Sequence, residues 1–401
     1  MQMEVVCGHL KPAILGGTPA FSARIPMVKP DLPSVDLLLR DARTILESGQ
    51  ITNGRWVREF EKGACDFLGV PECVAVSSCT SGLILLFRCL DLKGEVILPS
   101  FTFLATGIAL IWNGIRPVFA DCDPSSFNID PLKCESLITP RTSAILGVHL
   151  YGNPANVPAL DGLAKKHGLR LVFDAAHGFG ALREQRRVGV FGDAEVFSLS
   201  PTKLLVAGEG GLIATHDSKL AARLRAARNY GDPGTYDPIV VGLNARMPEL
   251  NAMMAYHGLE CVDQQVVRRK ALADFFMREL GRLPGVSFQT VRKEDVSTWK
   301  DFTMIVDPDE FGMPRDELAV ALTAENLEVR KYFFPPLHQQ EIYRQYYDPA
   351  KQELRVTEQV SSRVLCLPIY SSLKEESLTK VVEVVHHIFR AGARSKSTAR
   401  R

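Results

Sequence analysis

Short apolar runs alternate with amphipathic stretches between residues 74 and 229, and this alternation limits the possible folds more than any other feature of the chain. The runs are rich in Val, Ile and Phe, and most of the stretches between them have helical spacing. A repeated order of strand and helix predicts an α/β fold, in which helices cover both faces of a mostly parallel sheet. The expected strands lie at 74–76, 95–98, 117–120, 144–148, 169–173, 195–197 and 211–215.

The pattern changes after Leu250. A helical stretch with a charged middle occupies 251–283, and strands are expected near 302–306 and 327–330, with helices over 315–325 and 373–389. This order predicts a smaller α+β C-terminal domain. We therefore divide the chain into an N-terminal arm (1–30), a large domain (31–255), a small domain (256–392) and a basic, Ser-rich, disordered tail (393–401).

The charge balance indicates a small-molecule partner. Lys and Arg number 47 against 46 Asp and Glu, so no excess of positive charge prepares the surface for nucleic acid or an anionic membrane. The nine cysteines show no CxxC spacing, which favours reduced thiols over a disulfide framework or a metal site. No metal is expected.

One uncharged segment, 96–115, is long enough to cross a bilayer. It contains Pro99, Gly107 and Gly114, which fit strand, loop and buried helix better. The first 17 residues lack a continuous apolar region of the kind found in signal peptides. We expect no membrane association and a cytoplasmic location.

A single lysine follows a strand that ends in small hydroxylated residues. Residues 197–203 read Phe-Ser-Leu-Ser-Pro-Thr-Lys, and Gly208 and Gly210 come soon after. A lysine held at a strand end in apolar surroundings has a lowered pKa and can attack a carbonyl carbon. A surface-loop lysine is the simpler alternative if Lys203 is considered alone.

Asp174 comes directly after the apolar run 171–173, and Ala175, Ala176 and His177 follow it. An Asp at the carboxyl end of a strand can pair with a protonated ring nitrogen and keep it cationic. The small residues beside it allow a flat ring to approach the backbone. Taken singly, Asp174 can equally be a helix cap, and His177 a hydrogen-bonded core histidine.

The segment 77–82, here called the phosphate loop, reads Ser-Ser-Cys-Thr-Ser-Gly and lies between a strand and a helix. Its N–H groups and hydroxyls converge on the helix N-terminus, which is a favourable place for a phosphate. An ordinary Ser/Thr N-cap is the alternative. The loop is not Gly-rich, and the chain has neither a GxGxxG after a strand nor a GxxxxGK[ST].

A phosphate loop, a strand-end Asp and a lysine nucleophile, in this order, are the groups that pyridoxal 5′-phosphate requires. With further motifs in the same order, the chain resembles the DegT/DnrJ/EryC1/StrS family of sugar aminotransferases, which has fold type I of the pyridoxal-phosphate enzymes. The resemblance runs from about Pro26 to about Tyr370. Its motifs are Gly49-Gln50-Ile51-Thr52-Asn53-Gly54, Pro99-Ser100-Phe101-Thr102-Phe103, His149-Leu150-Tyr151-Gly152, Asp174-Ala175-Ala176-His177, Pro201-Thr202-Lys203, Arg228-Asn229-Tyr230-Gly231, Asn244-Ala245-Arg246-Met247 and Pro336-Leu337-His338.

The resemblance implies a role for each matched position. Lys203 would bind the cofactor covalently, Asp174 would pair with its ring nitrogen, and these two residues with His177 would form the catalytic set. Cys79 stands where many relatives have Gly or Ala, so the phosphate loop departs from the family pattern there. The implied cofactor-binding residues are Thr80, Ser81, Phe103, Asp174, Ala176, His177, Ser198, Lys203 and, from the neighbouring subunit of a homodimer with shared active sites, Asn244.

The activity implied by the resemblance is transfer of an amino group to the keto group of a nucleotide-activated deoxysugar, with L-glutamate as the expected donor. A family branch that dehydrates sugars has histidine in place of the lysine, so Lys203 argues against that branch. Two alternatives stay open. An aminotransferase for keto-cyclitols fits residues 14–20, Ile-Leu-Gly-Gly-Thr-Pro-Ala, because such arms also precede cyclitol enzymes, and a non-catalytic regulator could bind the cofactor or a sugar.

The substrate pocket is expected near 330–338, which reads Arg-Lys-Tyr-Phe-Phe-Pro-Pro-Leu-His. A nucleotide diphosphate needs cations for its charge and flat apolar surface for its base. We predict Arg330, Lys331 and Tyr332 as substrate-binding residues, and we expect the two phenylalanines to belong to the core of the small domain.

Overall fold

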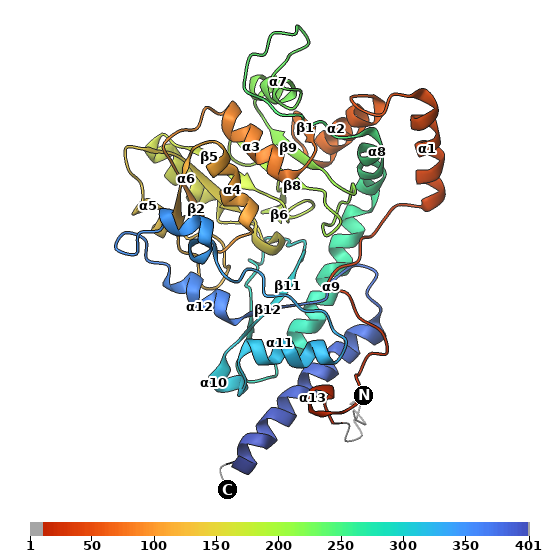
Figure 1. Ribbon diagram of the computed structural model, residues 1–401, viewed down its shortest axis with the longest axis vertical. Coiled ribbons are helices and arrows are strands. Elements are labelled where there is room, and N and C mark those ends of the chain that lie inside the picture. The colour runs from red at the N-terminus through yellow and green to blue at the C-terminus, as the bar shows by residue number, and fades with distance from the viewer. Residues whose placement is uncertain (1–10, 400–401) are drawn as a thin grey trace.

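A seven-stranded sheet lies at the centre of the larger part of the computed structural model, which describes the backbone of residues 11–399 and the side chains of 11–392 (Figure 1). β9 runs antiparallel to both of its neighbours, and the other neighbouring strands pair in parallel. The expected α/β class is confirmed. In spatial order the strands are β1 (Glu72–Val76), β9 (Gly211–Thr215), β8 (Ala194–Ser198), β5 (Arg170–Asp174), β4 (Thr142–Val148), β2 (Glu95–Pro99) and β3 (Arg116–Ala120).

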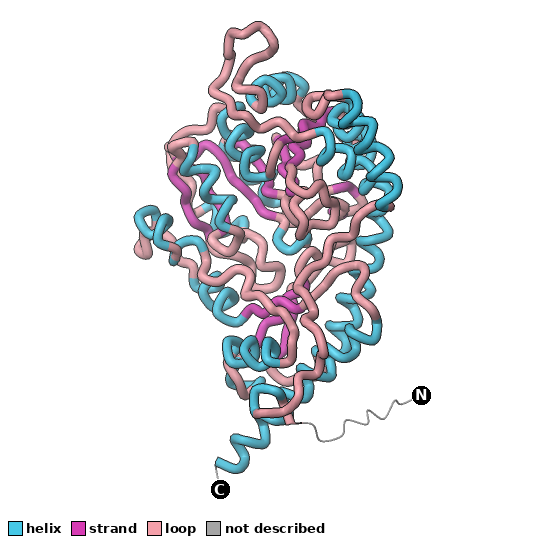
Figure 2. Tube along the Cα trace, turned by 45° about the vertical axis from the view of Figure 1, so that its right-hand side comes forward, coloured by secondary structure: helices cyan, strands magenta, loops and turns pink. Residues whose placement is uncertain are grey.

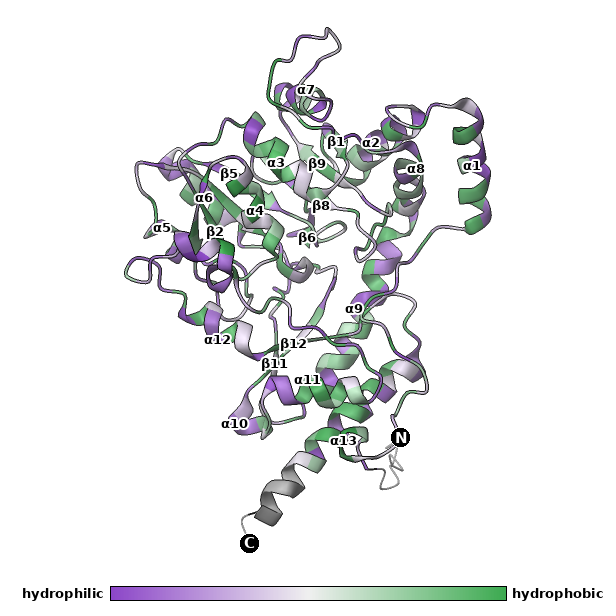
Figure 3. Cartoon of the chain, in the orientation of Figure 1, coloured by the Kyte–Doolittle hydropathy of each residue, from purple (hydrophilic) through white to green (hydrophobic). Residues whose placement is uncertain are grey.

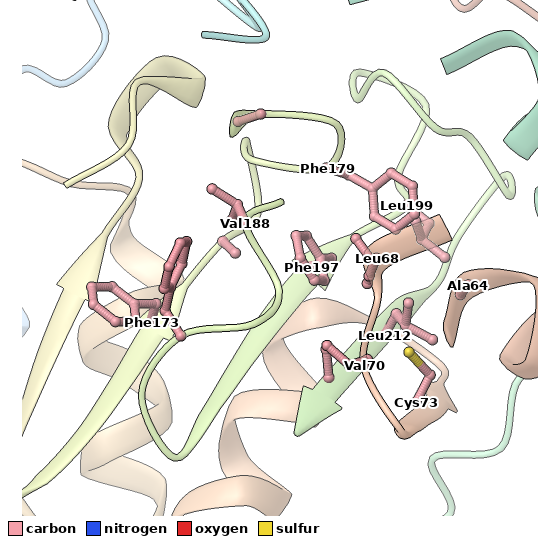
Figure 4. Packing of buried hydrophobic residues seen from close by; sticks show 14 of the residues in the cluster. Ala64, Leu68, Val70, Cys73, Phe173, Phe179, Val188, Phe197, Leu199 and Leu212 are labelled. Carbon is pink, nitrogen blue, oxygen red and sulfur yellow. The ribbon is translucent and has the colours of Figure 1, made fainter. Parts of the chain in front are cut away.

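Successive residues of each strand face opposite sides of this sheet, and helices cover both sides. In β1, Cys73 and Ala75 join one apolar cluster, and Val74 and Val76 join another. Figure 4 shows the first cluster, where Leu68 approaches Phe197 and Leu212. The first side is packed by α2 (Arg55–Leu68), α6 (Val157–His167) and α8 (Glu249–Gly258), and the second by α3 (Cys79–Cys89), α4 (Leu104–Trp112) and α7 (Ser218–Ala227).

A second sheet of three antiparallel strands belongs to the later part of the chain, and Figure 2 shows its strands apart from the main sheet. Its strands are β10 (Val286–Phe288), β11 (Phe302–Val306) and β12 (Val364–Leu367). Apolar residues of α11 and of the first half of α13 gather where these helices meet (Figure 3). The neighbouring helices are α9 (Val262–Leu280), α10 (Pro308–Phe311), α11 (Arg315–Ala324), α12 (Arg355–Arg363) and α13 (Glu375–Ala399).

The first described residues pack against this second part. The N–H groups of Ala13 and Ala20 both donate to the Glu325 carboxylate at 2.7 Å, and the ring of Phe21 lies in the apolar cluster of the small sheet. The remaining elements are short or peripheral. They are η1 (Ala13–Leu15), α1 (Val35–Ser48), α5 (Pro131–Glu135), η2 (Leu150–Gly152), β6 (Leu182–Arg183), β7 (Arg186–Arg187), η3 (Leu259–Cys261), η4 (Leu337–Gln339) and η5 (Glu341–Tyr346).

Three expectations about the later chain need correction or stay open. The predicted strand at 327–330 makes only isolated bridges, because its two ends pair with different segments: Leu327 pairs with Ile25, and Arg330 pairs with Cys366 of β12. The tail expected to be disordered is helical as far as Ala399, since no Gly or Pro interrupts α13 after Gly392; residues 400–401 lie outside the described part. The domain boundary near residue 255 stays a prediction.

None of the helices in the described residues is both long and apolar enough to cross a membrane.

Candidate active site

The candidate active site lies at the edge of the main sheet where the parallel strands β1, β5 and β8 end. Asp174 is the last residue of β5, Ser198 is the last residue of β8, and the phosphate loop follows β1. They surround a cavity of about 360 Å³. Its lining residues are Ser78, Cys79, Thr80, Thr102, Phe103, Ala105, Val148, Asp174, Ala176, His177, Ser198, Ser200, Thr202, Lys203, Glu209, Gly210, Lys300, Asp301, Tyr332 and Phe333.

Lys203 has the properties expected of a nucleophile. Its backbone N–H donates to the carbonyl of Ser200 at 3.0 Å, which closes a turn after β8. Its amine makes no hydrogen bond or ion pair within the described part of the chain. Burial, followed by the positive charge of Lys300, lowers the pKa of Lys203 to about 8. About a tenth of this amine is therefore unprotonated at pH 7, far more than for an ordinary lysine.

Asp174 is oriented by its neighbours. The hydroxyl of Thr106 donates to Oδ2 at 2.7 Å, and the N–H of Ala176 donates to Oδ1 at 3.1 Å. The Thr102 hydroxyl lies 3.1 Å from that of Thr106 and donates to it, since the proton of Thr106 is already used. Burial raises the pKa of Asp174, and the hydrogen bonds from Thr106 and from the N–H of Ala176 oppose this rise. A cation beside the carboxylate would lower its pKa again.

His177 is held as a neutral imidazole. Its Nδ1 accepts the N–H of Tyr151 at 3.1 Å, so the ring proton is on Nε2. Burial and the charges of Lys203 and Lys300 lower the pKa of His177 well below its ordinary value. The Nε2–H of His177 has no partner among the residues described and is free to donate to a ligand.

The N-terminus of α3 offers unused hydrogen-bond donors to the cavity. Ser78 and Ser81 cap the helix reciprocally: the Ser81 N–H donates to Ser78 Oγ and the Ser78 N–H to Ser81 Oγ, both at 3.0 Å. In the described part of the structure, the N–H groups of Cys79 and Thr80 have no protein acceptor, and neither does the Thr80 hydroxyl. This arrangement suits a phosphate group.

Most of the residues expected at the site are brought together. Lys203, Asp174, His177, Ala176, Thr80, Phe103, Ser198 and Tyr332 all line the cavity. Ser81 does not, because its hydroxyl serves the helix cap.

Asn244 is exposed and lies outside the cavity lining. Arg330 and Lys331 do not line the cavity either. Arg330 pairs with Glu328, and Lys331 pairs with Asp316 at 2.6 Å. The expected roles of these three residues stay predictions.

Several residues of the site were not predicted from the sequence. Thr106 and Tyr151 position Asp174 and His177, and Phe333 lines the cavity and stacks on His177 with ring centroids 6.2 Å apart. Lys300 and Asp301 also line it. The pattern of the chain offered little signal for this pair, because two charged residues before a strand resemble a solvated turn.

The donor set fits pyridoxal 5′-phosphate. The free N–H groups of α3 match its phosphate, the unpartnered amine of Lys203 matches its aldehyde, and buried Asp174 matches its ring nitrogen. The rings of Phe103 and Phe333, with centroids 6.0 Å apart, add apolar surface beside them. Among the side chains that the structure describes, no group of three or more His, Cys, Asp or Glu could hold a metal ion.

Comparisons with known proteins agree with this geometry. The model of the DegT/DnrJ/EryC1/StrS aminotransferase family matches residues 36–386. The chain is 32% identical over 363 residues to dTDP-4-amino-4,6-dideoxy-D-glucose transaminase of Escherichia coli, covering 90% of this chain and 98% of that protein.

Two solved structures extend the comparison. DesI, solved in the presence of its TDP-sugar product, has a TM-score of 0.91 and 36% identity, covering 97% of this chain and 99% of DesI. NtdA from Bacillus subtilis with bound cofactor PMP has a TM-score of 0.84 and 27% identity, covering 92% of this chain and 86% of NtdA.

Proposed function

Since the chain belongs to the DegT/DnrJ/EryC1/StrS aminotransferase family and is an aminotransferase that uses pyridoxal 5′-phosphate, we propose that it aminates a keto group of a nucleotide-activated deoxysugar with L-glutamate as donor. The observation that carries the proposal is the convergence of Lys203, Asp174 and the α3 N-terminus on one cavity. The substrate class is proposed because the E. coli transaminase and DesI are named for dTDP- and TDP-sugars.

The chain's own residues supply the acid–base steps. When bound, pyridoxal phosphate supplies an aldehyde for the amine and a ring that takes up electrons. Lys203 Nζ, once released by the donor, would act as the base that removes the proton from the donor carbon and then as the acid that gives the proton back. The Asp174 carboxylate would accept a hydrogen bond from the protonated ring nitrogen and keep that nitrogen cationic, and Thr106, which donates to Oδ2, holds the carboxylate in place. The neutral His177 would donate a hydrogen bond from its Nε2–H to the bound ligand.

The nucleotide part of the substrate extends beyond the cavity in this proposal. The cavity volume of about 360 Å³ lies near the lower end of the usual range for ligand pockets, and the cofactor must occupy part of it. Arg330 and Lys331 are candidates for the diphosphate, because the side chains of these two cations are 48% and 39% exposed and ion pairs of exposed cations are weak enough to exchange. Tyr332, the next residue, already lines the cavity.

We further propose a homodimer in which Asn244 of each subunit completes the phosphate site of the other, and a cytoplasmic location. Exposure of Asn244 together with nearby apolar side chains supports the dimer: Ile239, Val241 and Leu243, which shortly precede it, and Tyr230, which follows its bridge partner Asn229, are also exposed.

Absorbance of the purified protein tests the proposed activity. We expect a yellow protein that bleaches toward the pyridoxamine spectrum when L-glutamate is added, and nucleotide ketosugars should restore the aldehyde spectrum. Lys203→Ala should abolish both changes while circular dichroism stays unchanged. If keto-cyclitols alone restored the spectrum, the substrate would be a cyclitol; no change with any amino acid would favour a non-catalytic regulator.

A further inference from the structure

A buried ion pair forms one wall of the active-site cavity. Lys300 Nζ and Asp301 Oδ1 lie 2.8 Å apart, and their side chains are 6% and 0% exposed. Both residues line the cavity that contains Lys203. They precede β11, so they approach the site from the small sheet, whereas Asp174 and Thr80 approach it from the main sheet.

The backbone of the pair is held firmly from two directions. The N–H of Lys300 donates to the carbonyl of Tyr151 at 2.9 Å. From α9, the buried Arg269 donates through Nη1 to the carbonyl of Lys300 at 3.3 Å. The pair is therefore a fixed part of the cavity wall rather than a mobile surface contact.

The pair has hydrogen-bonding capacity that the described residues do not use. Asp301 Oδ2 is buried and has no partner among them. The Lys300 ammonium has three N–H donors, and within the same residues its only hydrogen-bond acceptor is Asp301; it also lies 5.6 Å from the ring centroid of Tyr332. A buried carboxylate oxygen without a donor is unfavourable, so a ligand that supplies one gains binding energy here.

The chemistry of the pair favours a hydroxyl group as that ligand. The pair carries no net charge, and Asp301 would repel the carboxylate of an amino-acid donor or a phosphate. A hydroxyl can donate one hydrogen bond and accept another, which matches the free acceptor of Asp301 and the free donors of Lys300. The uses proposed above for Asp174, Thr80 and Lys203 leave this wall available to the sugar.

We propose that Lys300 and Asp301 read a ring hydroxyl of the ketosugar: the hydroxyl donates to the Asp301 carboxylate and accepts from the Lys300 ammonium. This inference rests on the proposed function, because it assumes a sugar substrate. It makes the pair a specificity determinant for the sugar half of the reaction, with no contact to the amino donor.

Asp301→Asn tests the proposal when each half-reaction is measured in a single turnover. For the nucleotide ketosugar we measure the single-turnover rate constant divided by the half-saturating concentration. We expect this ratio to fall about 10- to 100-fold, which is the effect of losing one hydrogen bond to a charged group. The L-glutamate half-reaction, compared at a pH above about 8 where Lys203 is mostly unprotonated in both proteins, should stay within about twofold. Equal losses in both halves would overturn the proposal. Asp274→Asn, which neutralises an exposed carboxylate that pairs with Lys270 outside the cavity, is the matched control and should leave both half-reactions unchanged.

Matched substrates connect the effect to a hydroxyl. The wild-type enzyme should lose about 10- to 100-fold with one nucleotide ketosugar that lacks a single ring hydroxyl, and Asp301→Asn should react with that analogue and its parent at similar rates. Calorimetric binding of the aminated nucleotide sugar to the holoenzyme should weaken in the variant, while binding of the nucleoside diphosphate alone should not.

If Asp301→Asn fails to fold, the rates of the wild-type enzyme with deoxygenated analogues still test whether a ring hydroxyl is recognised. If every deoxygenated analogue reacted as fast as its parent, the hydroxyl-reading role would be wrong while the proposed function stood. If no nucleotide ketosugar reacted at all, the proposed function itself would fail.

Discussion

Single residues in this site derive their chemistry from burial and from one or two fixed neighbours. The pKa of Lys203 falls and that of Asp174 rises for the same reason, since loss of water disfavours either charge. Thr106 and Tyr151 add direction, because each donates to one named atom of Asp174 or His177. Substitution of one of these residues or of its neighbour should therefore change the acid–base behaviour of the site in a predictable direction.

Asp174→Asn should keep the cofactor but slow the proton transfer. An amide cannot stabilise a protonated ring nitrogen as a carboxylate does, and loss of such a charge-assisted hydrogen bond costs about 1.5–3 kcal/mol, or roughly one to two decades in rate. Single-turnover absorbance with L-glutamate measures this. Thr106→Val, which removes only the donor to Oδ2, should show a smaller loss in the same direction. An unfolded Asp174→Asn protein would instead identify Asp174 as a structural cap.

Covalent capture of pyridoxal phosphate by the apoprotein should depend on pH through Lys203. Below pH about 8 most of the amine is protonated and only the unprotonated fraction attacks, so the capture rate rises as pH passes through that value. Lys300 lowers this pKa, whereas Asp301, Cys79 and Asp174 raise it. Lys300→Met should therefore move the midpoint of the rate profile to higher pH.

Stopped-flow absorbance measures the capture rate, and Lys331→Met should leave the midpoint unchanged. A midpoint that stayed constant or moved to lower pH in Lys300→Met would contradict the proposed electrostatic coupling of the two lysines.

Helix and strand ends hold these residues in position. The α3 N-terminus presents free N–H groups to the cavity only while the reciprocal cap between Ser78 and Ser81 holds the first turn in place. Ser81 was expected to bind phosphate directly, and the structure gives its hydroxyl to the cap. Its contribution to cofactor binding would then be indirect.

Ser81→Ala should lower both the stability of the apoprotein and its affinity for pyridoxal phosphate. Loss of a cap hydrogen bond costs about 1 kcal/mol, measurable by urea unfolding. Asp217→Ala provides the comparison, because Asp217 caps α7 by accepting from Lys219 and Leu220 and does not line the cavity. It should cost similar stability and leave cofactor affinity unchanged. Equal affinities in both variants would show that the α3 cap does not serve the phosphate.

The strands of the main sheet were predictable because each is a short apolar run bounded by polar or turn residues. Their directions were not. The runs at β8 and β9 look alike, and an apolar run carries no information about whether its neighbour is parallel.

The same limit applied to the site. Lys203, Asp174 and the phosphate loop were identifiable because each stands at a strand end. Lys300 and Asp301 reach the cavity only because the small sheet packs against the large one, and the sequence does not reveal that packing. Arg330 and Lys331 carry the same kind of charge as Lys300, so charge alone could not show which cations line the cavity.

At the scale of the whole molecule, the site is assembled from segments distant in sequence, and the proposed dimer would add a segment of a second chain. Complementation tests this. Lys203→Ala and Asn244→Ala homodimers should each have little activity, because every site lacks one residue. Mixed dimers contain one site with both native residues, so subunit exchange should restore up to about half of the activity per hybrid.

Exchange must be demonstrated independently, for example by affinity-tagging one variant and recovering both. No recovery of activity after proven exchange would exclude a shared site. Exchange between two Lys203→Ala preparations is the matched control and should restore nothing.

The position of β9 has a consequence for how the protein is made. Among the described strands, β1 pairs only with β9, which is the last strand of the main sheet to leave the ribosome. Gly211 pairs with Val76 on one side and Ser198 on the other, and a side chain at Gly211 would collide with Ser78. A nascent chain that ends before β9 thus exposes the edges of β1 and β8 and has an unsupported phosphate loop, although Asp174 and Lys203 are already present. Completion of the site therefore requires β9, the strand that joins β1 to β8.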